Sequence, residues 1–256
     1  MIYTEKKLSE IANQMEELIN EYSDYYKLRD MLDLDTVNTK IWSKGYIEPF
    51  CCDYITDLFD NTVIPRKLMK LPKKKDFVSL HYMCDSVPVY SVYYADVDDI
   101  SKEKIYINSS EKRIELLFNS KKHILLSIAL TLFDSQERPI EYSQISINSK
   151  GLKMINNAIY TYEDNYIVKA ESIRDFNPEA GIVLFNDEAF DSSLLIQSKI
   201  MNPPDVQIIN FNYNGNVLQT FTRTDFEYGK TYENTWKKRK TVIKNYIECG
   251  IKWFGD

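Results

Sequence analysis

Glycine and histidine are scarce in this chain, and their scarcity excludes several kinds of active site. Only 7 of the 256 residues are glycine, which leaves little room for backbone loops that cradle phosphate groups. No phosphate-binding loop, dinucleotide-binding glycine pattern or G-x-S-x-G nucleophile elbow is present. The two histidines, His81 and His123, belong to no recognisable metal-ligand motif. We therefore expect a protein that is not an enzyme and uses no metal or cofactor, with both histidines as ordinary strand or turn residues.

Long apolar runs and paired cysteines are also missing. The longest apolar-rich stretch covers residues 124–132 and is interrupted by Ser127 and Thr131, well short of the ~20 apolar residues that a membrane-spanning helix needs. The first residues lack the apolar core of a signal peptide. The four cysteines, at positions 51, 52, 84 and 249, form no C-x-x-C pair. These absences predict a cytoplasmic protein with reduced thiols and no membrane partner.

Acidic residues outnumber basic residues over the whole chain, but one segment is strongly basic. The formal net charge of −6 argues against a general nucleic-acid binder, which needs a basic face that neutralises several phosphates. An acidic chain suits a basic partner better. Residues 61–75 nevertheless carry six basic residues and no acidic one. We interpret this block as a solvated linker, with phosphate or membrane contact as the alternative.

Tyrosine, in contrast, is abundant, and three segments share one local pattern. The chain has 19 tyrosines, a residue that suits half-buried pleated surfaces. In residues 133–140, 162–169 and 213–218, an aromatic residue ends an alternating run, a short Asp/Asn/Glu turn follows, and a second apolar or β-branched run begins. This pattern predicts β-hairpins with turns near residues 135–138, 164–165 and 214–216.

The N-terminal part has a helical period instead. Residues 4–31 are predicted to form one amphipathic helix, because apolar residues recur there at spacings of three and four: Leu8, Ile11, Met15, Leu18, Ile19, Tyr22 and Tyr26. A shorter helix is expected over residues 53–59. The predicted organisation is a helical region over residues 1–75, ending in the basic linker, and an antiparallel hairpin domain over residues 76–256.

From residue 77 onward the period changes to two, which predicts successive strands. The expected strand pairs are 77–82 with 87–94, 105–107 with 114–118, and 126–132 with 140–147. Residues 175–205 break the pattern around an expected helix at residues 187–198. The tail is expected to form either a hairpin of residues 236–243 with 246–253 or a terminal helix over residues 235–249.

The segment 133–140 resembles one unit of the tyrosine–aspartate repeats of bacterial rearrangement-hotspot proteins and teneurins. Phe133 and Asp134 take the places of the repeat's Tyr-Asp, and Arg138, followed by Pro139 and Ile140, stands at the place of its Arg or Asn. Glu137 stands where that pattern has glycine. Tyr162 and Tyr213 begin shortened versions. The resemblance implies hairpins in an extended antiparallel sheet over roughly 100 residues. The spacing of the three units is irregular, and the chain is too short for that family's encapsulating shell.

Two acidic clusters are the candidate contact residues. Asp53, Asp57 and Asp60 have i, i+4, i+7 spacing and would share one face of the expected second helix, where carboxylates can meet lysines of a partner or hold magnesium. The second cluster is an acidic turn formed by Asp96, Asp98 and Asp99. It lacks the glycine and the closing glutamate of a calcium loop.

These observations predict an α+β protein with an N-terminal helical segment and a large, twisted antiparallel sheet of successive hairpins. Its composition is similar to that of small cytosolic immunity proteins of bacterial polymorphic-toxin systems. That similarity implies a non-enzymatic protein that neutralises a basic toxin domain by direct binding, through the six aspartates named above. The alternatives are an enzyme with a scattered, metal-dependent carboxylate site, which sequence order does not forbid, and a structural or phage-derived assembly protein.

Overall fold

One antiparallel sheet forms most of the protein. The computed structural model describes residues 5–44, 66–68, 70–85, 87–96, 99–147, 153–164, 166–176, 205–215, 217–227 and 230–237. Its strands are β1 (Thr39–Lys44), β2 (Arg66–Lys67), β3 (Val78–Cys84), β4 (Val87–Asp96), β5 (Asp99–Asn108), β6 (Lys112–Asn119), β7 (Leu125–Phe133), β8 (Pro139–Ile147), β9 (Lys153–Glu163), β10 (Tyr166–Phe176), β11 (Asp205–Asn214), β12 (Val217–Glu227) and β13 (Lys230–Lys237).

The strands follow one another across the sheet almost in chain order. Within the described residues the sheet has thirteen strands, and β3 to β13 are consecutive neighbours. β1 pairs antiparallel with β3, and β2 lies beyond β1 at the edge. The predicted α+β class, with helices first and then successive antiparallel hairpins, is confirmed. β1 and β2 precede residue 75 and still belong to this sheet, while the predicted domain division itself stays a prediction.

The N-terminal helical stretch consists of two helices rather than the single helix predicted. α1 spans Glu5–Tyr22 and α2 spans Tyr25–Met31, with a short 3-10 turn at Leu34–Thr36. The break occurs because Asp24 caps a new helix: its backbone is extended, and its carboxylate accepts a hydrogen bond from the Lys27 amide at 3.1 Å. The apolar spacing continues through the break, so periodicity alone did not reveal it.

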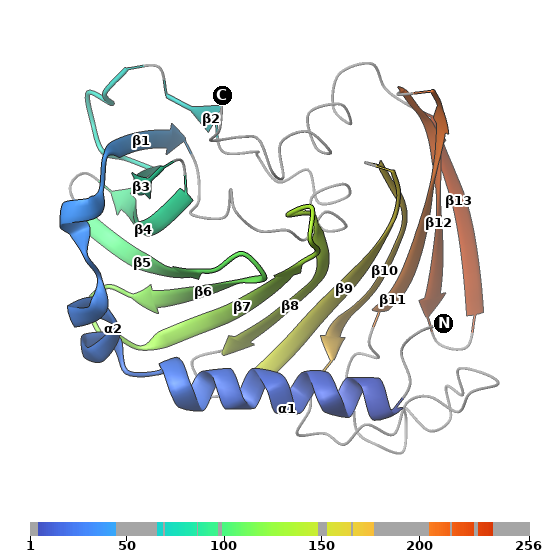
Figure 1. Cartoon of the computed structure of the whole chain (residues 1–256), viewed down its shortest axis with the longest axis horizontal. Coiled ribbons are helices and arrows are strands. Elements are labelled where there is room, and N and C mark those ends of the chain that lie inside the picture. The colour runs from blue at the N-terminus through green and yellow to red at the C-terminus, as the bar shows by residue number, and fades with distance from the viewer. Residues whose placement is uncertain are drawn as a thin grey trace.

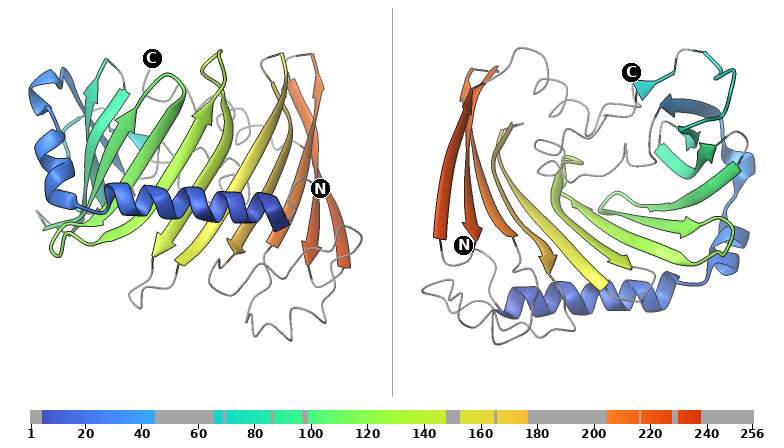
Figure 2. Two further views of the ribbon diagram at one scale, coloured as in Figure 1. Left: turned by 60° about the horizontal axis from the view of Figure 1, so that its bottom comes forward. Right: turned by 180° about the vertical axis from the view of Figure 1, so that it is seen from behind.

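α1 covers one side of a sheet that curls into a deep arc. Figure 1 shows the helix running beneath the arc, and the left view of Figure 2 shows it crossing the middle strands. We call the side that carries α1 the outer face, and the opposite side the inner face. Leu8, Ile11 and Met15 are fully buried against outer-face residues of the middle strands. Two ion pairs hold the helix at its edges, Lys7 Nζ with Glu141 Oε1 at 3.0 Å and Lys153 Nζ with Glu16 Oε2 at 2.7 Å.

α2 is attached to the outer face by an aromatic and polar contact. The Tyr25 hydroxyl donates to Glu103 Oε2 at 2.8 Å, and the hydroxyl of Tyr90 donates to the same oxygen. The Arg29 guanidinium lies 4.4 Å from the centre of the Tyr90 ring. Burial and the Glu103 carboxylate together raise the pKa of Tyr25 to about 12. α2 therefore has a fixed position on β4 and β5.

Alternation along each strand gives the two faces different cores. In β7, Ile128 belongs to the cluster beneath α1, whereas its neighbour Ala129 packs in the inner-face cluster with Tyr142 and Tyr160. That inner cluster continues towards the C-terminal strands through Ile209, Phe211 and Phe221. The two-residue period inferred from the sequence is thus the period that separates the two cores.

The predicted hairpins are confirmed. β3 pairs with β4, β5 with β6 and β7 with β8, and the three repeated segments form the hairpins β7–β8, β9–β10 and β11–β12. His81 lies in β3 and His123 in the turn after β6, as expected. The helices predicted at residues 53–59 and 187–198, and most of the predicted tail structure, lie outside the described residues.

Candidate functional site

The turns of alternate hairpins gather at one end of the sheet. A meander returns to the same end after every second strand, so the turns after β3, β5, β7, β9 and β11 share an end. In the left view of Figure 2 the turns after β7, β9 and β11 lie along the upper edge. All three repeated segments identified in the sequence therefore place their turns on one edge of the molecule. We call this edge the turn rim.

The turn rim carries an excess of exposed carboxylates. The exposed acidic residues in and beside these turns are Asp85, Glu111, Glu137, Glu163 and Asp164. Lys40, at the start of β1, and Lys112, at the start of β6, are exposed cations at the same end. Arg138 is held in an ion pair with Asp134. The rim therefore presents a negative field to the solvent, which attracts a basic partner.

Asp134 fixes the conformation of the turn between β7 and β8. Its Oδ1 accepts hydrogen bonds from the amides of Gln136 at 2.9 Å and Arg138 at 3.0 Å. Its Oδ2 lies 2.7 Å from the Arg138 guanidinium. Partial burial acts to raise the pKa of the Asp134 carboxyl, but these bonds outweigh it and lower that pKa below its usual value. Asp134 and Arg138, two residues of the repeat-like motif, therefore hold the two ends of this turn together.

Arg138 also connects this turn to the next hairpin. Its guanidinium donates to the backbone oxygen of Asp164 and lies 4.6 Å from the centre of the Tyr162 ring. The Tyr162 hydroxyl returns a hydrogen bond to the Pro139 oxygen at 2.9 Å. The aromatic residue that begins the second repeated segment therefore holds the first and second turns together.

The same kind of contact extends along the rim in both directions. Towards β5, the Phe133 amide donates to the Glu111 oxygen at 2.8 Å. Towards β11, the Tyr213 hydroxyl donates to the Ile167 oxygen at 3.0 Å, and its ring lies 5.0 Å from that of Tyr166. Four consecutive turns are linked in this way, so their carboxylates are displayed on a preorganised edge rather than on independent loops.

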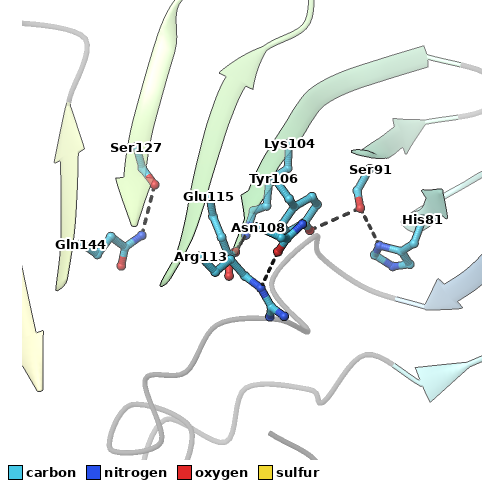
Figure 3. A network of polar contacts seen from close by, with 9 residues as sticks. All are labelled: His81, Ser91, Lys104, Tyr106, Asn108, Arg113, Glu115, Ser127 and Gln144. Atoms are coloured by element: carbon cyan, nitrogen blue, oxygen red, sulfur yellow. Dashed lines mark hydrogen bonds and ion pairs between the residues drawn. The ribbon is translucent and has the colours of Figure 1, made fainter. Parts of the chain in front are cut away.

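The inner face contains the only histidine-centred network in the described part of the chain. Figure 3 shows His81, Ser91 and Tyr106 in a line across β3, β4 and β5. His81 Nδ1 lies 2.8 Å from Ser91 Oγ, and its Nε2 lies 2.8 Å from Ser43 Oγ. Beside this line, Lys104 Nζ pairs with Glu115 Oε2 at 2.9 Å.

This network has the residue types of a serine–histidine site but not its electrostatics. Burial lowers the pKa of His81 to about 3, and the positive charge of Lys104 adds to the effect. An imidazole with so low a pKa is a weak general base at neutral pH. Ser43, His81 and Ser91 are fully buried, and both ring nitrogens face serine hydroxyls, where a catalytic histidine has a carboxylate partner. The geometry favours a structural role in joining β1, β3 and β4.

Comparisons with known proteins leave the family open. Neither a family model nor a curated protein sequence matches the chain. Among solved structures, a porin-like protein from Bacteroides vulgatus is similar over 65% of this chain and 80% of its own, with 10% identity and a TM-score of 0.32. That score is too low to support an argument about fold or function.

Two of the six predicted contact aspartates, Asp96 and Asp99, are among the described residues. Asp53, Asp57, Asp60 and Asp98 lie outside the described residues. Asp96 and Asp99 pair across the end of the β4–β5 hairpin, at the end of the sheet opposite the turn rim, and Asp99 Oδ2 lies 3.0 Å from Lys121 Nζ. Among the described residues, no three histidine, cysteine, aspartate or glutamate side chains come together in a group that could hold a metal.

Sequence reasoning missed the carboxylates of the turn rim. Glu137, Glu163 and Asp164 lie in the very turns that the repeated pattern identified, but each turn holds too few acidic residues to stand out alone. The available signal was the topology: in a meander of consecutive hairpins, every second turn falls on the same edge. Numbering the predicted hairpins in chain order would have assigned these residues to the same end of the sheet.

Proposed function

We propose that this protein is a non-enzymatic binding protein that holds a basic protein partner against its turn rim. In its most specific form it is an immunity protein that neutralises a toxin domain by covering the active surface of that domain. The observation that carries the proposal is the turn rim itself, with exposed carboxylates on turns that are fixed to one another by Asp134, Arg138, Tyr162 and Tyr213.

The arrangement of charge and aromatic residues supports this function. Opposite charges across an interface accelerate encounter and fix the register of the complex. The half-buried rings of Tyr162, Tyr166 and Tyr213 offer contact area that loses little side-chain entropy on binding. Because the turns are already connected, ordering them on binding costs little. The rim therefore has the properties of a protein-contact surface rather than those of a pocket for a small substrate.

The enzyme alternative has less support from the geometry. The buried Ser43–His81–Ser91 line lacks a basic histidine. Of the six aspartates, Asp96 and Asp99 are the two among the described residues, and Asp99 is paired with Lys121. Glu115 and Lys104 form a buried ion pair, in which each charge is neutralised by the other. Nothing in these clusters activates a water molecule or a nucleophile in a recognisable way.

The proposal is tested by co-expression with the protein encoded next to this one. An immunity protein restores the growth of cells that produce the neighbouring toxin domain and forms a stable complex with it in size-exclusion chromatography. A chain with Glu137→Lys, Glu163→Lys and Asp164→Lys should lose both effects while its circular dichroism spectrum stays unchanged. If the neighbouring protein is not toxic and forms no complex with the unaltered chain, the proposal is wrong.

A further inference from the structure

The end of the sheet opposite the turn rim has the opposite charge. The turns after β4 and β6 and the segment that leads into β3 all lie at this end, which we call the basic end. Its exposed lysines are Lys44, Lys70, Lys73, Lys74, Lys121 and Lys122. In these turns and this segment, the acidic residues whose side chains are described are Asp76, Asp96 and Asp99, and Asp99 is paired with Lys121. The basic end is therefore a positive surface on a protein whose net charge is −6.

Large apolar side chains are exposed among these lysines. Leu71 is 78% exposed and Phe77 is 58% exposed, on either side of Lys73 and Lys74. Ile124, next to Lys121 and Lys122 in the turn after β6, is 54% exposed. The exposed apolar residues near the turn rim, Val87 and Ile140, are each only 36% exposed. Tyr26 and Met31, on α2, are 66% and 67% exposed, so apolar exposure is not confined to this end. Leu71, Phe77 and Ile124 are the exposed apolar residues that lie among the lysines.

Phe77 is held in this exposed position at a conformational cost. Its φ of 49° lies in the left-handed region, which bulky residues avoid. Burial of the ring does not offset this strain, because the side chain is mostly exposed. Lys75, two residues earlier, lies 5.3 Å from the centre of the Tyr94 ring and fixes the approach of the segment to β4. Such strain is found where the conformation serves binding.

The segment that carries Phe77 and the turn that carries Ile124 lie on one continuous edge of the sheet. The Ser120 amide donates to the Ser101 oxygen at 3.2 Å, which joins the turn after β6 to the start of β5. Asp99 pairs with Asp96 at the end of β4, and Tyr94 of β4 pairs with Val78, the residue after Phe77. Ile124 and Phe77 therefore lie at the same end, separated by the β4–β5 turn.

We propose that the basic end docks onto an anionic lipid surface. In this arrangement Leu71, Phe77 and Ile124 enter the interfacial region, and the neighbouring lysines contact lipid phosphates. Peripheral membrane binding depends on this combination of apolar insertion and attraction to acidic headgroups. Among the described residues no helix is long and apolar enough to cross a membrane. The proposal departs from the expectation of no membrane partner. It adopts the alternative interpretation of the basic block at residues 61–75, to which Lys70, Lys73 and Lys74 belong.

The exposed apolar residues favour a lipid surface over a soluble polyanion. A nucleic acid gains from lysines and from aromatic rings that stack on bases, but it offers nothing to the aliphatic side chains of Leu71 and Ile124. A lipid interface accommodates all three apolar residues. The turn rim, at the other end of the sheet, remains accessible to a protein partner while the basic end rests on the membrane.

Vesicle co-sedimentation of the full chain tests this inference. The chain should bind vesicles that mix phosphatidylglycerol with phosphatidylcholine at least about tenfold more tightly than pure phosphatidylcholine vesicles, and this preference should weaken as salt rises. The pair Lys73→Glu and Lys74→Glu should reduce binding to anionic vesicles by about tenfold or more. The pair Leu71→Ser and Phe77→Asn should also reduce it, since asparagine tolerates a positive φ and keeps the turn.

Matched changes at the turn rim provide the controls. Lys112→Glu reverses the charge of one exposed lysine, and Ile140→Ser removes one exposed apolar residue; neither should affect vesicle binding. Equal binding to anionic and neutral vesicles would overturn the proposal. It would also be overturned if the Leu71 and Phe77 changes had no effect, or if the chain bound duplex DNA or heparin but no vesicles, which would assign the lysines to a soluble polyanion.

Discussion

The turn residue Glu137 shows how one position departs from the pattern that surrounds it. It stands where the tyrosine–aspartate repeat has glycine, and its φ is 60°, in the left-handed region. The corresponding residue of the β11–β12 turn is Gly215, with a φ of 57°, and that of the β9–β10 turn is Asp164, with a φ of 51°. A residue with a left-handed backbone therefore occurs in all three turns, and it is a glycine in one of them.

We predict that Glu137→Gly stabilises the protein. A left-handed conformation costs a residue with a side chain ~1–2 kcal/mol, and part of that gain is offset by the extra freedom of glycine in the unfolded chain. The net increase in the free energy of unfolding should be about 0.5–1 kcal/mol, measured by chemical denaturation. Glu163→Gly, in the extended strand β9, is the matched control and should destabilise by a similar amount. Destabilisation by Glu137→Gly would contradict the assigned turn conformation.

His81 makes stability depend on pH. Its folded pKa of about 3 lies below the ~6.5 of an unfolded chain, so below pH 6.5 the unfolded state binds a proton that the folded state does not. Stability is therefore complete above pH 6.5 and falls as the pH decreases towards 3. Between pH 6.5 and 5 the free energy of unfolding should fall by about 2 kcal/mol. Urea denaturation at these two pH values measures this. A flat profile would mean that His81 takes up a proton in the folded protein as readily as in the unfolded chain.

At the scale of single elements, the packing of α1 is the most directly testable feature. Leu18 is 8% exposed and belongs to the cluster between α1 and the sheet. Leu18→Ala removes buried volume that the surrounding strands cannot refill, so we expect a loss of ~2–4 kcal/mol in the free energy of unfolding. Glu17→Ala, on the exposed side of the same helix, should change it by less than about 0.5 kcal/mol. A small effect at Leu18 would mean that α1 does not pack on the sheet in solution.

The elements themselves were largely predictable, and the exceptions have physical causes. Strand alternation and polar turns identified the hairpins because a sheet with two different faces needs a strict two-residue period. The boundary between α1 and α2 was not predictable from periodicity, because both helices bury residues on the same face. Its only signal was the capping aspartate, Asp24. β1 was missed because Trp42 and Ile41 lie in a short polar stretch without a clear alternation.

At the scale of the molecule, the distribution of charge was not predictable from the sequence. The turns after β3, β5, β7 and β9 carry carboxylates and the turn after β6 carries lysines, although the acidic turn after β4 lies at the basic end. Only the meander brings the first group together as the turn rim. The acidic clusters chosen from the sequence, Asp53 to Asp60 and Asp96 to Asp99, were local groupings of like charge. The turn rim assembles instead from carboxylates in successive turns: Asp85, Glu111, Glu137 and Glu163 each lie 26 residues after the one before, and Asp164 is next to Glu163.

The most direct test of the central claim is the association rate with the basic partner at two salt concentrations. The turn rim should steer the encounter, so the rate should fall as salt rises, and Glu137→Lys, Glu163→Lys and Asp164→Lys together should slow it at low salt by about tenfold or more. Reversal of Asp53, Asp57 and Asp60 tests the cluster chosen from the sequence in the same assay. An association rate that is unchanged in the rim variant, with its fold intact, would contradict the assignment of the turn rim as the binding surface.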